Sequence, residues 1–449
     1  MFAFGQLAPA CFNVTDSINS PSVSSGPAFI TNGDFNGDGI FDLAVSNFSS
    51  STISILLGVG NGSFMPTINY TLSNNPNYIS TSDFNNDNKP DLIVCNNSAS
   101  KITVLLGIGS GSFNISSTFT TGNLPISISV SDYNNDGNKD LAITNNGTYV
   151  SVLMGNGLGL FGTATNYTLP TSSASAVISK DFNGDGKIDL AITSTNSSAN
   201  MCVLLGSGTG SFSYLLTKSA GSAPLVMTYA DYNNDGFEDL ATANYNSDNV
   251  SVLLGIGSGN FANAVNFSVG SKPNSITNAD FNGDGKIDIA VANRFSNTTS
   301  ILLGLGNGNF NAAIDYTLGT WPLSITTADF NGDGKADLAA GNYYSSNVSI
   351  MLNCSSYTLA LPINIKDESS INVYPNPTNG VINIIFLNYN HNYTIINAEV
   401  FNILGQLVIS KTIANENESI NLEQFKSGIY FVKLMQNNNV ISTKKVIKE

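Results

Sequence analysis

The sequence predicts an all-β chain built from seven copies of one supersecondary unit, the pattern of a propeller or a solenoid. Two observations support this prediction. A ten-residue segment, Asp329–Leu338 in its last copy, recurs at starts that lie 49 residues apart and once 50. Short apolar runs lie between the copies and are bounded by Gly, Pro, Asn and Ser, which favour turns between strands. The seven copies start at Asp34, Asp83, Asp132, Asp181, Asp231, Asp280 and Asp329.

Each repeat carries four strand-like runs, which together make one antiparallel blade. Before the ten-residue segment comes a short apolar run such as 275–277, and after it comes a second run such as 288–292. A third run, 250–254 in its own repeat, leads to a glycine-rich stretch, 255–261, and to a weaker outer strand ending near Val269. Runs that are apolar on both faces suit sheets packed between neighbouring sheets.

The glycine-rich stretch has the composition of a phosphate-binding loop. A dinucleotide fingerprint opens a helix, however, and here a strand follows the glycines. A tight hairpin, with the phenylalanine of the stretch returning to the core, is the simpler interpretation.

The ten-residue segment has the composition of a calcium loop. Positions 1, 3, 5 and 9 carry Asp or Asn, and position 7 offers its backbone carbonyl, so every candidate ligand is an oxygen, as calcium prefers. Position 6 is glycine in six copies and Asn88 in the second, and both residues tolerate a left-handed backbone. Asx-turn chemistry is the alternative, but we expect turns alone not to require the carboxylate at position 9 in every copy.

The expected calcium ligands are thirty-five residues, five in each copy. They are Asp34, Asn36, Asp38, Ile40, Asp42, Asp83, Asn85, Asp87, Lys89, Asp91, Asp132, Asn134, Asp136, Asn138, Asp140, Asp181, Asn183, Asp185, Lys187, Asp189, Asp231, Asn233, Asp235, Phe237, Asp239, Asp280, Asn282, Asp284, Lys286, Asp288, Asp329, Asn331, Asp333, Lys335 and Asp337. Twenty-one of the 32 acidic residues are the aspartates of these segments, so the negative charge is concentrated there. Seven bound calcium ions would bring the formal charge from -15 to about -1.

Composition excludes several classes of protein. Among 449 residues, 42% are apolar, and no run approaches the 18 apolar residues of a membrane span. Lys and Arg number only 17, which argues against nucleic acid as a partner. Residues 1–10 are either the end of a signal peptide or a disordered start. Cys95 and Cys202 replace small strand residues of other repeats and, lying two blades apart, are not expected to pair with each other.

Taken together, the motif Asp-Phe-Asn-Gly-Asp-Gly-Lys-x-Asp-Leu and the following Leu-Leu-Gly-x-Gly-x-Gly-x-Phe resemble the FG-GAP/VCBS repeat family, which is related to the integrin alpha-subunit propeller. The resemblance covers about residues 12–353. It implies a seven-bladed β-propeller with calcium in the loop between the first and second strand of each blade, and hence up to seven calcium ions.

The seventh copy lacks the glycine hairpin and the outer strand that should follow it. The missing strand is available at the other end of the chain, because residues 12–18 precede Asp34 at nearly the spacing of the outer strands of other copies. This alignment places Cys11 opposite Cys354 and predicts a disulfide that closes the ring, which requires an oxidising compartment. Two unpaired thiols, or Cys11 as a lipid anchor, are the alternatives. The propeller is therefore expected over 11–356.

After an expected linker, 357–370, the composition changes. Residues 371–449 carry six lysines against five glutamates, and strand signals recur at 381–386, 398–401, 407–413 and 429–434. These signals predict a small antiparallel β-sandwich.

The tail also resembles the type A C-terminal sorting domain of the bacterial type IX secretion system. The motifs are Tyr374-Pro375-Asn376-Pro377, Phe401–Gln406, Ser427–Val432 and Lys444–Lys448. The resemblance implies a Bacteroidetes-type protein that the secretion machinery exports to the outer-membrane surface or beyond. A resident immunoglobulin-like binding module is the alternative.

Catalysis finds little support in the sequence. The single histidine, His391, lies in the tail, so the propeller has no Ser-His-Asp or Cys-His arrangement. Glu238 and Asp248 are acids outside the calcium ligand set and have no visible partner. A polysaccharide-degrading enzyme on a calcium propeller remains an alternative.

Ligand binding is the favoured function, on the rim opposite the calcium loops, where the repeats stop agreeing. Aromatic rings among asparagines suit sugars, whereas the integrin resemblance suits a protein ligand in cell adhesion. Drift in exposed loops and a purely structural, monomeric surface protein are the alternatives. The candidate rim residues are Phe48, Tyr245, Lys272, Arg294, Phe295, Trp321, Tyr343 and Tyr344, with Leu124 and Tyr149 as further members.

Overall fold

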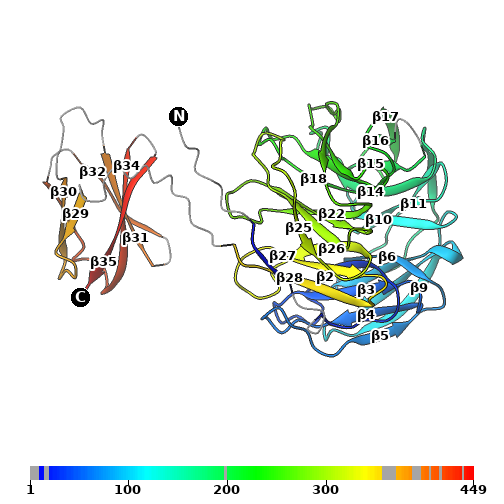
Figure 1. Cartoon of the computed structure of the whole chain (residues 1–449), viewed down its shortest axis with the longest axis horizontal. Coiled ribbons are helices and arrows are strands. Elements are labelled where there is room, and N and C mark those ends of the chain that lie inside the picture. The colour runs from blue at the N-terminus through cyan, green and yellow to red at the C-terminus, as the bar shows by residue number, and fades with distance from the viewer. Residues whose placement is uncertain are drawn as a thin grey trace. The chain divides into compact units, whose positions relative to one another are not determined.

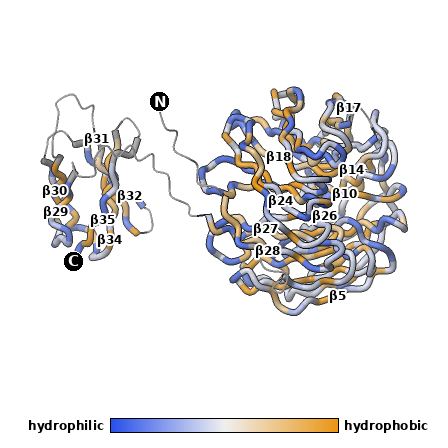
Figure 2. Tube along the Cα trace, viewed as in Figure 1, coloured by the Kyte–Doolittle hydropathy of each residue, from blue (hydrophilic) through white to orange (hydrophobic). Residues whose placement is uncertain are grey.

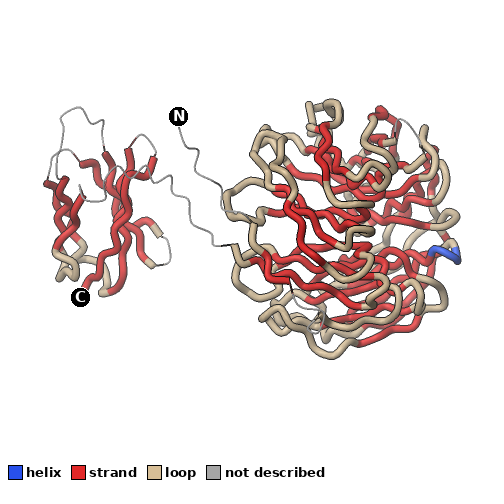
Figure 3. The backbone as a smooth tube through the Cα atoms, viewed as in Figure 1, coloured by secondary structure: helices blue, strands red, loops and turns tan. Residues whose placement is uncertain are grey.

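The computed structural model describes residues 10–14, 20–196, 200–355, 371–386, 396–403, 406–413, 417–436 and 439–449. The chain divides into two compact units, 1–356 and 357–449, which are described separately below (Figure 1). Strands dominate both units, and the only helix among the described residues is the short 3-10 helix η1 (Asn97–Ala99) (Figure 3). No helix within these residues is long and apolar enough to cross a membrane.

The larger unit contains seven four-stranded antiparallel sheets, numbered here 1 to 7 in chain order, as expected of a propeller. Sheets 1 to 3 are β2 (Pro27–Gly33), β3 (Asp42–Asn47), β4 (Thr52–Leu56) and β5 (Ile68–Thr71); β6 (Pro76–Ser82), β7 (Asp91–Asn96), β8 (Lys101–Gly107) and β9 (Phe113–Thr120); and β10 (Pro125–Ser131), β11 (Asp140–Asn145), β12 (Tyr149–Leu153) and β13 (Thr165–Thr168).

Sheets 4 to 6 follow the same order of strands. They are β14 (Ala174–Lys180), β15 (Asp189–Ser194), β16 (Met201–Gly206) and β17 (Phe212–Lys218); β18 (Pro224–Ala230), β19 (Asp239–Asn244), β20 (Asn249–Leu253) and β21 (Val265–Ser268); and β22 (Pro273–Ala279), β23 (Asp288–Asn293), β24 (Thr298–Leu302) and β25 (Ile314–Thr317). Sheet 7 is β26 (Pro322–Ala328), β27 (Asp337–Asn342), β28 (Asn347–Asn353) and β1 (Phe12–Val14).

Burial follows the position of a strand within its sheet. Every residue of each second strand, such as β3, is buried, because neighbouring sheets cover both of its faces. The fourth strand, such as β5, is largely exposed. Hydrophobic residues accordingly gather on the strands and hydrophilic ones in the loops (Figure 2). The continuous apolar runs in the sequence are thus the strands with two covered faces.

Neighbouring sheets are joined by a repeated aromatic pair. The aromatic residue at position 2 of one loop packs edge-on against the hairpin phenylalanine of the next sheet, as Phe35 does against Phe113, with ring centroids 5.4 Å apart. Phe330 of sheet 7 makes the same contact with Phe64 of sheet 1 at 6.0 Å. The first strand of each sheet also lies beside the first strand of the next, and β26 lies beside β2. Sheets 7 and 1 are therefore neighbours.

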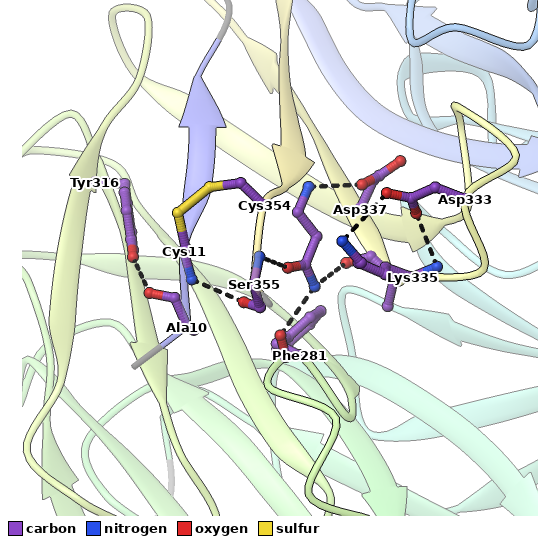
Figure 4. Close-up of a disulfide and its surroundings, with 11 residues drawn as sticks. Ala10, Cys11, Phe281, Tyr316, Asp333, Lys335, Asp337, Cys354 and Ser355 are labelled. Atoms are coloured by element: carbon purple, nitrogen blue, oxygen red, sulfur yellow. Dashed lines mark hydrogen bonds and ion pairs between the residues drawn. A yellow bond between two sulfur atoms is a disulfide. The ribbon is translucent and has the colours of Figure 1, made fainter. Parts of the chain in front are cut away.

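The N-terminal strand supplies the fourth strand of sheet 7, as the missing hairpin predicts. β1 pairs with β28, Phe12 opposite Asn353, and residues 15–18 of the predicted strand lie outside the described residues. The predicted disulfide between Cys11 and Cys354 is confirmed, with Cα atoms 5.0 Å apart (Figure 4). Cys354 N donates to Cys11 O at 2.8 Å, and Cys11 N donates to Ser355 Oγ at 2.9 Å. Phe12 packs edge-on against Phe281 and so takes the place of the absent hairpin phenylalanine.

The other two cysteines are unpaired, as predicted, and both are buried. Cys95 packs in the core between sheets 2 and 3, and Cys202 in the core between sheets 3 and 4. Burial raises the pKa of the Cys202 thiol to about 12 and raises that of Cys95 as well. Both are therefore unreactive core residues.

The smaller unit consists of two antiparallel sheets that share one hydrophobic core. One sheet is β29 (Ile371–Tyr374), β30 (Val381–Phe386) and β33 (Asn417–Asn421); the other is β32 (Leu407–Ile413), β31 (Ile396–Asn402), β34 (Gly428–Gln436) and β35 (Asn439–Lys448). The four predicted strands are present. The sequence reasoning missed β29, β33 and β35, because polar residues and lysines interrupt their apolar runs.

Candidate metal loops and ligand-binding rim

Each candidate metal loop connects the first and second strand of a sheet and folds around the aspartate at position 1. In loop 1, Asp34 Oδ1 accepts the backbone N–H of Asp38 at 3.1 Å, and Asp34 Oδ2 accepts that of Gly39 at 2.9 Å. The equivalent bonds from positions 5 and 6 recur in the other six loops. The repeated sequence therefore produces one loop conformation seven times.

Two positions of the loop need a left-handed backbone. Position 6 has positive φ in every copy, 82° at Gly39 and 62° at Asn88, as predicted. Position 4 does too, with φ of 77° at Gly37 and 59° at Asn86, which the sequence reasoning missed. The signal was present, since position 4 is only ever Gly or Asn, the two residues that enter this region most readily.

The carboxylate at position 5 finds a donor in one of two ways. Its Oδ1 always accepts the backbone N–H of position 7. Its Oδ2 accepts the position-3 amide in loops 1, 3 and 5, as Asp38 does from Asn36 Nδ2 at 2.9 Å. In loops 2, 4, 6 and 7 the lysine at position 7 forms an ion pair with this Oδ2 instead. In loop 2, Lys89 Nζ lies 3.4 Å from Asp87 Oδ2.

The carboxylate at position 9 ties its loop to the following hairpin. Asp42 is fully buried, its Oδ2 accepts Phe35 N at 2.8 Å, and its Oδ1 accepts Gly58 N at 2.7 Å. The same two bonds occur in all seven copies, with Asn353 N as the second donor to Asp337. The argument that turn chemistry has no need of this carboxylate is therefore wrong, because the residue has a structural role without an ion.

Burial also changes the acidity of the position-9 group. Desolvation raises the pKa of Asp42, Asp189, Asp239 and Asp337 to about 6, and that of Asp288 to about 7. The negative charges at positions 1 and 5 of the same loop raise it further. A bound cation would remove this repulsion, since it neutralises the charge that the three carboxylates share.

The donor set fits a hard cation. Within the described residues, no group of three or more His, Cys, Asp or Glu side chains is arranged as a metal cluster. The position-1 carboxylates accept backbone N–H groups of their own loops, as Asp34 does. Every loop nevertheless offers three carboxylates, an amide oxygen and the position-7 carbonyl, and none offers sulfur or imidazole. A carboxylate has about four lone-pair sites, so oxygens that accept one N–H can also contact an ion.

A variant pair in one loop separates the structural and ion-binding roles. Without calcium, Asp337→Asn should lower the free energy of unfolding by ~1–3 kcal/mol, because the amide leaves one buried N–H without an acceptor. Asp333→Asn should be nearly neutral, since it keeps the Oδ1 acceptor and loses only an exposed ion pair. Urea unfolding in EDTA measures both. Equal losses would contradict the structural role of position 9.

The opposite rim has seven equivalent backbone positions. In every sheet, the first residue of the loop after the second strand donates its N–H to the carbonyl of the residue just before the first strand. The seven donor and acceptor pairs are Phe48 and Gly26, Asn97 and Asn75, Asn146 and Leu124, Thr195 and Ser173, Tyr245 and Ala223, Arg294 and Lys272, and Tyr343 and Trp321. These pairs lie at the strand ends away from the metal loops. The seven rim positions therefore share this backbone hydrogen bond and differ in their side chains.

Large aromatic and cationic side chains gather in the pairs of sheets 5 to 7 and directly after them. We call Tyr245, Lys272, Arg294, Phe295, Trp321, Tyr343 and Tyr344 the rim patch. Within it, Phe295 stacks on Trp321 with ring centroids 5.4 Å apart. The ring centroids of Trp321 and Tyr344 are 4.2 Å apart. Tyr245 packs edge-on against Phe295, with ring centroids 6.4 Å apart. Tyr343 packs edge-on against Tyr344, with ring centroids 5.3 Å apart.

The two cations of the rim patch rest on its rings. The guanidinium of Arg294 lies 3.9 Å from the centroid of Trp321, and Lys272 Nζ lies 5.1 Å from that of Tyr245. Arg294 Nε is buried and has no hydrogen-bond partner. The structure therefore brings seven of the eight predicted ligand-binding residues into one surface.

The remaining predicted residues stand apart. Phe48, Tyr149 and Leu124 make no ring contact with the rim patch. Tyr149 instead accepts the N–H of Asn123 through its hydroxyl at 3.2 Å. The two acids without a visible partner in the sequence do have partners: Glu238 pairs with Lys180 Nζ at 2.9 Å, and Asp248 Oδ1 accepts Lys272 N at 2.8 Å.

A cavity of about 290 Å³ lies at the rim end of the first strands. All seven first strands line it, with residues such as Phe29 and Tyr78 on one side and Asn274 on another, and Asn146 and Thr195 of the rim are also part of it. Asn77 is one of the lining residues, and its Oδ1 is buried without a hydrogen-bond partner. The cavity contains none of the rim-patch side chains.

The repeats, loops and sheets define a protein built from repeated four-stranded units, and family models agree. Models of the FG-GAP-like repeat match residues 34–94, 83–143, 132–192, 181–242, 231–291 and 280–340, each window spanning two successive loops. The chain belongs to the FG-GAP-like repeat family. A second model, the secretion system C-terminal sorting domain, matches residues 372–449. This tail is the predicted type IX sorting domain, and it indicates secretion to the bacterial cell surface or beyond.

Solved structures share the fold at low sequence identity. A chain of the crystal structure of BBS1N in complex with ARL6DN is 11% identical, with a TM-score of 0.54 over 77% of this chain and 97% of that one. A protein from Lactobacillus plantarum is 13% identical, with a TM-score of 0.52 over 67% of this chain and 88% of that one. None of the curated proteins matches the chain. At such identities the similarity concerns the fold alone.

Proposed function

We propose that the chain is a secreted adhesion protein that binds an extracellular glycan or protein through the rim patch. Calcium ions in the seven loops would stiffen the domain that carries the patch. The sorting tail would pass the protein to the type IX secretion machinery. In this proposal the chain is a monomeric binding protein and not an enzyme.

The observation that supports this most is the distribution of side chains over the seven equivalent rim pairs. Four sheets carry small or isolated side chains there, whereas the pairs of sheets 5 to 7 carry five aromatic or cationic residues, and Phe295 and Tyr344 next to them complete a cluster of seven in mutual contact. Scattered surface aromatics are ordinary, but a continuous, partly exposed cluster on three adjacent sheets supports a binding surface.

We further propose that the seven sheets form a closed propeller whose blades hold the rim in one plane. Two observations support closure. The aromatic pair of Phe330 and Phe64 completes a series of seven between successive sheets, and all seven first strands line one cavity. The Cys11–Cys354 disulfide would then secure the sheet in which the chain ends meet.

Replacing Trp321 with alanine should weaken ligand binding by at least ~10-fold, because its ring contacts Phe295, Tyr344 and Arg294. The full chain would be applied in calcium to arrays of glycans and matrix proteins, and affinity for each hit measured by biolayer interferometry. Phe48→Ala, at an equivalent rim position outside the patch, is the matched control and should bind as the wild type does. No saturable binding by well-folded protein, or equal loss in both variants, would refute the proposed site.

A further inference from the structure

We propose that the rim patch recognises acidic polysaccharides, whose sugar rings carry carboxylate or sulfate groups. This inference depends on the proposed binding function of the rim and specifies its ligand. It is based on the position of the rim's positive charges and on how they are held.

The charges of the larger unit are divided between its two ends. In the described rim segments, which are the loops after the second strands and the links before the first strands, the charged residues are Lys272, Arg294 and Asp248. The two cations belong to the rim patch. The opposite end carries the twenty-one loop aspartates and Glu238 against five loop lysines, and so has a large excess of negative charge. A polyanion is therefore attracted to the patch, and it is repelled from the opposite end when the loops hold no cation.

Neither cation is neutralised by an acid. No described carboxylate forms an ion pair with Lys272 or Arg294, and the side chain of Asp248 accepts the backbone N–H of Lys272. Lys272 Nζ has the amide oxygen of Asn246 at 3.4 Å, and Arg294 Nε has no partner. A guanidinium stacked on an indole keeps its in-plane N–H groups free, and their fork matches a carboxylate or sulfate.

The rings supply the second half of the recognition. Phe295 is 49% exposed and Tyr344 is 60% exposed, although both pack against Trp321. Such fixed, half-exposed rings offer an apolar face to a sugar at little cost in side-chain entropy. A neutral sugar leaves the two cations unpaired, and a plain polyanion leaves the rings bare. Only an acidic saccharide uses both features.

The test compares four polymers on the full chain in calcium. Hyaluronan carries carboxylates, chondroitin sulfate carries carboxylates and sulfates, dextran is neutral, and polyglutamate has charge without sugar rings. We expect the first or second to bind at least ~10-fold more tightly than dextran and polyglutamate, with an affinity that falls as sodium chloride is raised. Which of the two binds better identifies the acidic group.

Variants assign the binding to the patch. The double change Lys272→Gln and Arg294→Gln should weaken binding of the acidic glycan by ~10-fold or more, since it removes both charged hydrogen-bond donors of the patch. Phe48→Ala should leave binding unchanged, and melting temperatures of all variants should show that the fold is intact. Loss of binding in Asp333→Asn, but not in the double variant, would place the polymer at the metal loops and overturn the inference.

The remaining outcomes separate this inference from the proposed function. Equal binding of dextran, reduced by Trp321→Ala but not by the glutamine pair, would overturn the acidic ligand and leave a glycan-binding rim. Binding of polyglutamate alone would overturn the saccharide and favour an acidic protein ligand at the rim. Absence of any rim-dependent binding would overturn both.

Discussion

Calcium is expected to raise the melting temperature of the full chain by ~10–25 °C above its value in EDTA. A loop held at 100 times its dissociation constant adds about 2.7 kcal/mol to the stability of the folded state, and the repeat provides seven loops of one conformation. Dividing the added stability of three to seven filled loops by an unfolding entropy of ~2.1 cal/mol/K per residue gives this range of melting-temperature shifts. Scanning calorimetry with and without calcium measures it.

Three controls show whether the shift comes from the loops. Sodium chloride at equal ionic strength screens the aspartates without coordination and should raise the melting temperature much less. Asp333→Asn should reduce the calcium-induced rise in melting temperature by about the contribution of one loop. Asp315 is an exposed acid outside the loops, so Asp315→Asn should not reduce it. A shift that sodium reproduces, or that both variants reduce equally, would contradict calcium binding at these loops.

Loss of the Cys11–Cys354 disulfide is expected to lower the free energy of unfolding by at most about 5 kcal/mol, equivalent to ~7 °C in melting temperature. The effect is large because the bond joins residues 343 positions apart and so restricts almost the whole unfolded chain. Urea unfolding of the double variant Cys11→Ser and Cys354→Ser, against the wild type, measures it.

Dithiothreitol provides the internal control for this prediction. It should lower the stability of the wild type to that of the double variant and leave the double variant unchanged, because Cys95 and Cys202 are buried free thiols. A double variant as stable as the oxidised wild type would mean that the pairing of β1 with β28 alone secures the chain ends.

The repeat made much of the fold predictable. Identical residues in identical register impose the same local structure seven times, so the four-strand sheets and the second strands starting at position 9 follow from the sequence. The disulfide was predictable for a related reason. The last copy lacks its fourth strand, and a strand without a partner lies at the other end of the chain. Pairing the two is the simplest arrangement, and it brings Cys11 next to Cys354.

Other features depend on contacts that a sequence alignment does not display. The carboxylate of Asp42 accepts an N–H from Gly58, 16 residues away, and only the folded hairpin shows that position 9 has this structural use. The rim patch was predicted as a set of residues, but not which of its side chains meet. Trp321 turns toward Phe295 of the preceding sheet, whereas Phe48 of sheet 1 makes no such contact, and side-chain direction decides this difference.

Counting bound calcium tests the central claim most directly. The full chain would be stripped with EDTA, dialysed against calcium, and analysed by isothermal titration calorimetry and elemental analysis. The account predicts several ions per chain, up to seven, and one fewer in Asp333→Asn. A chain that binds no calcium would contradict it, and the seven acidic loops would then be turns held only by their own hydrogen bonds.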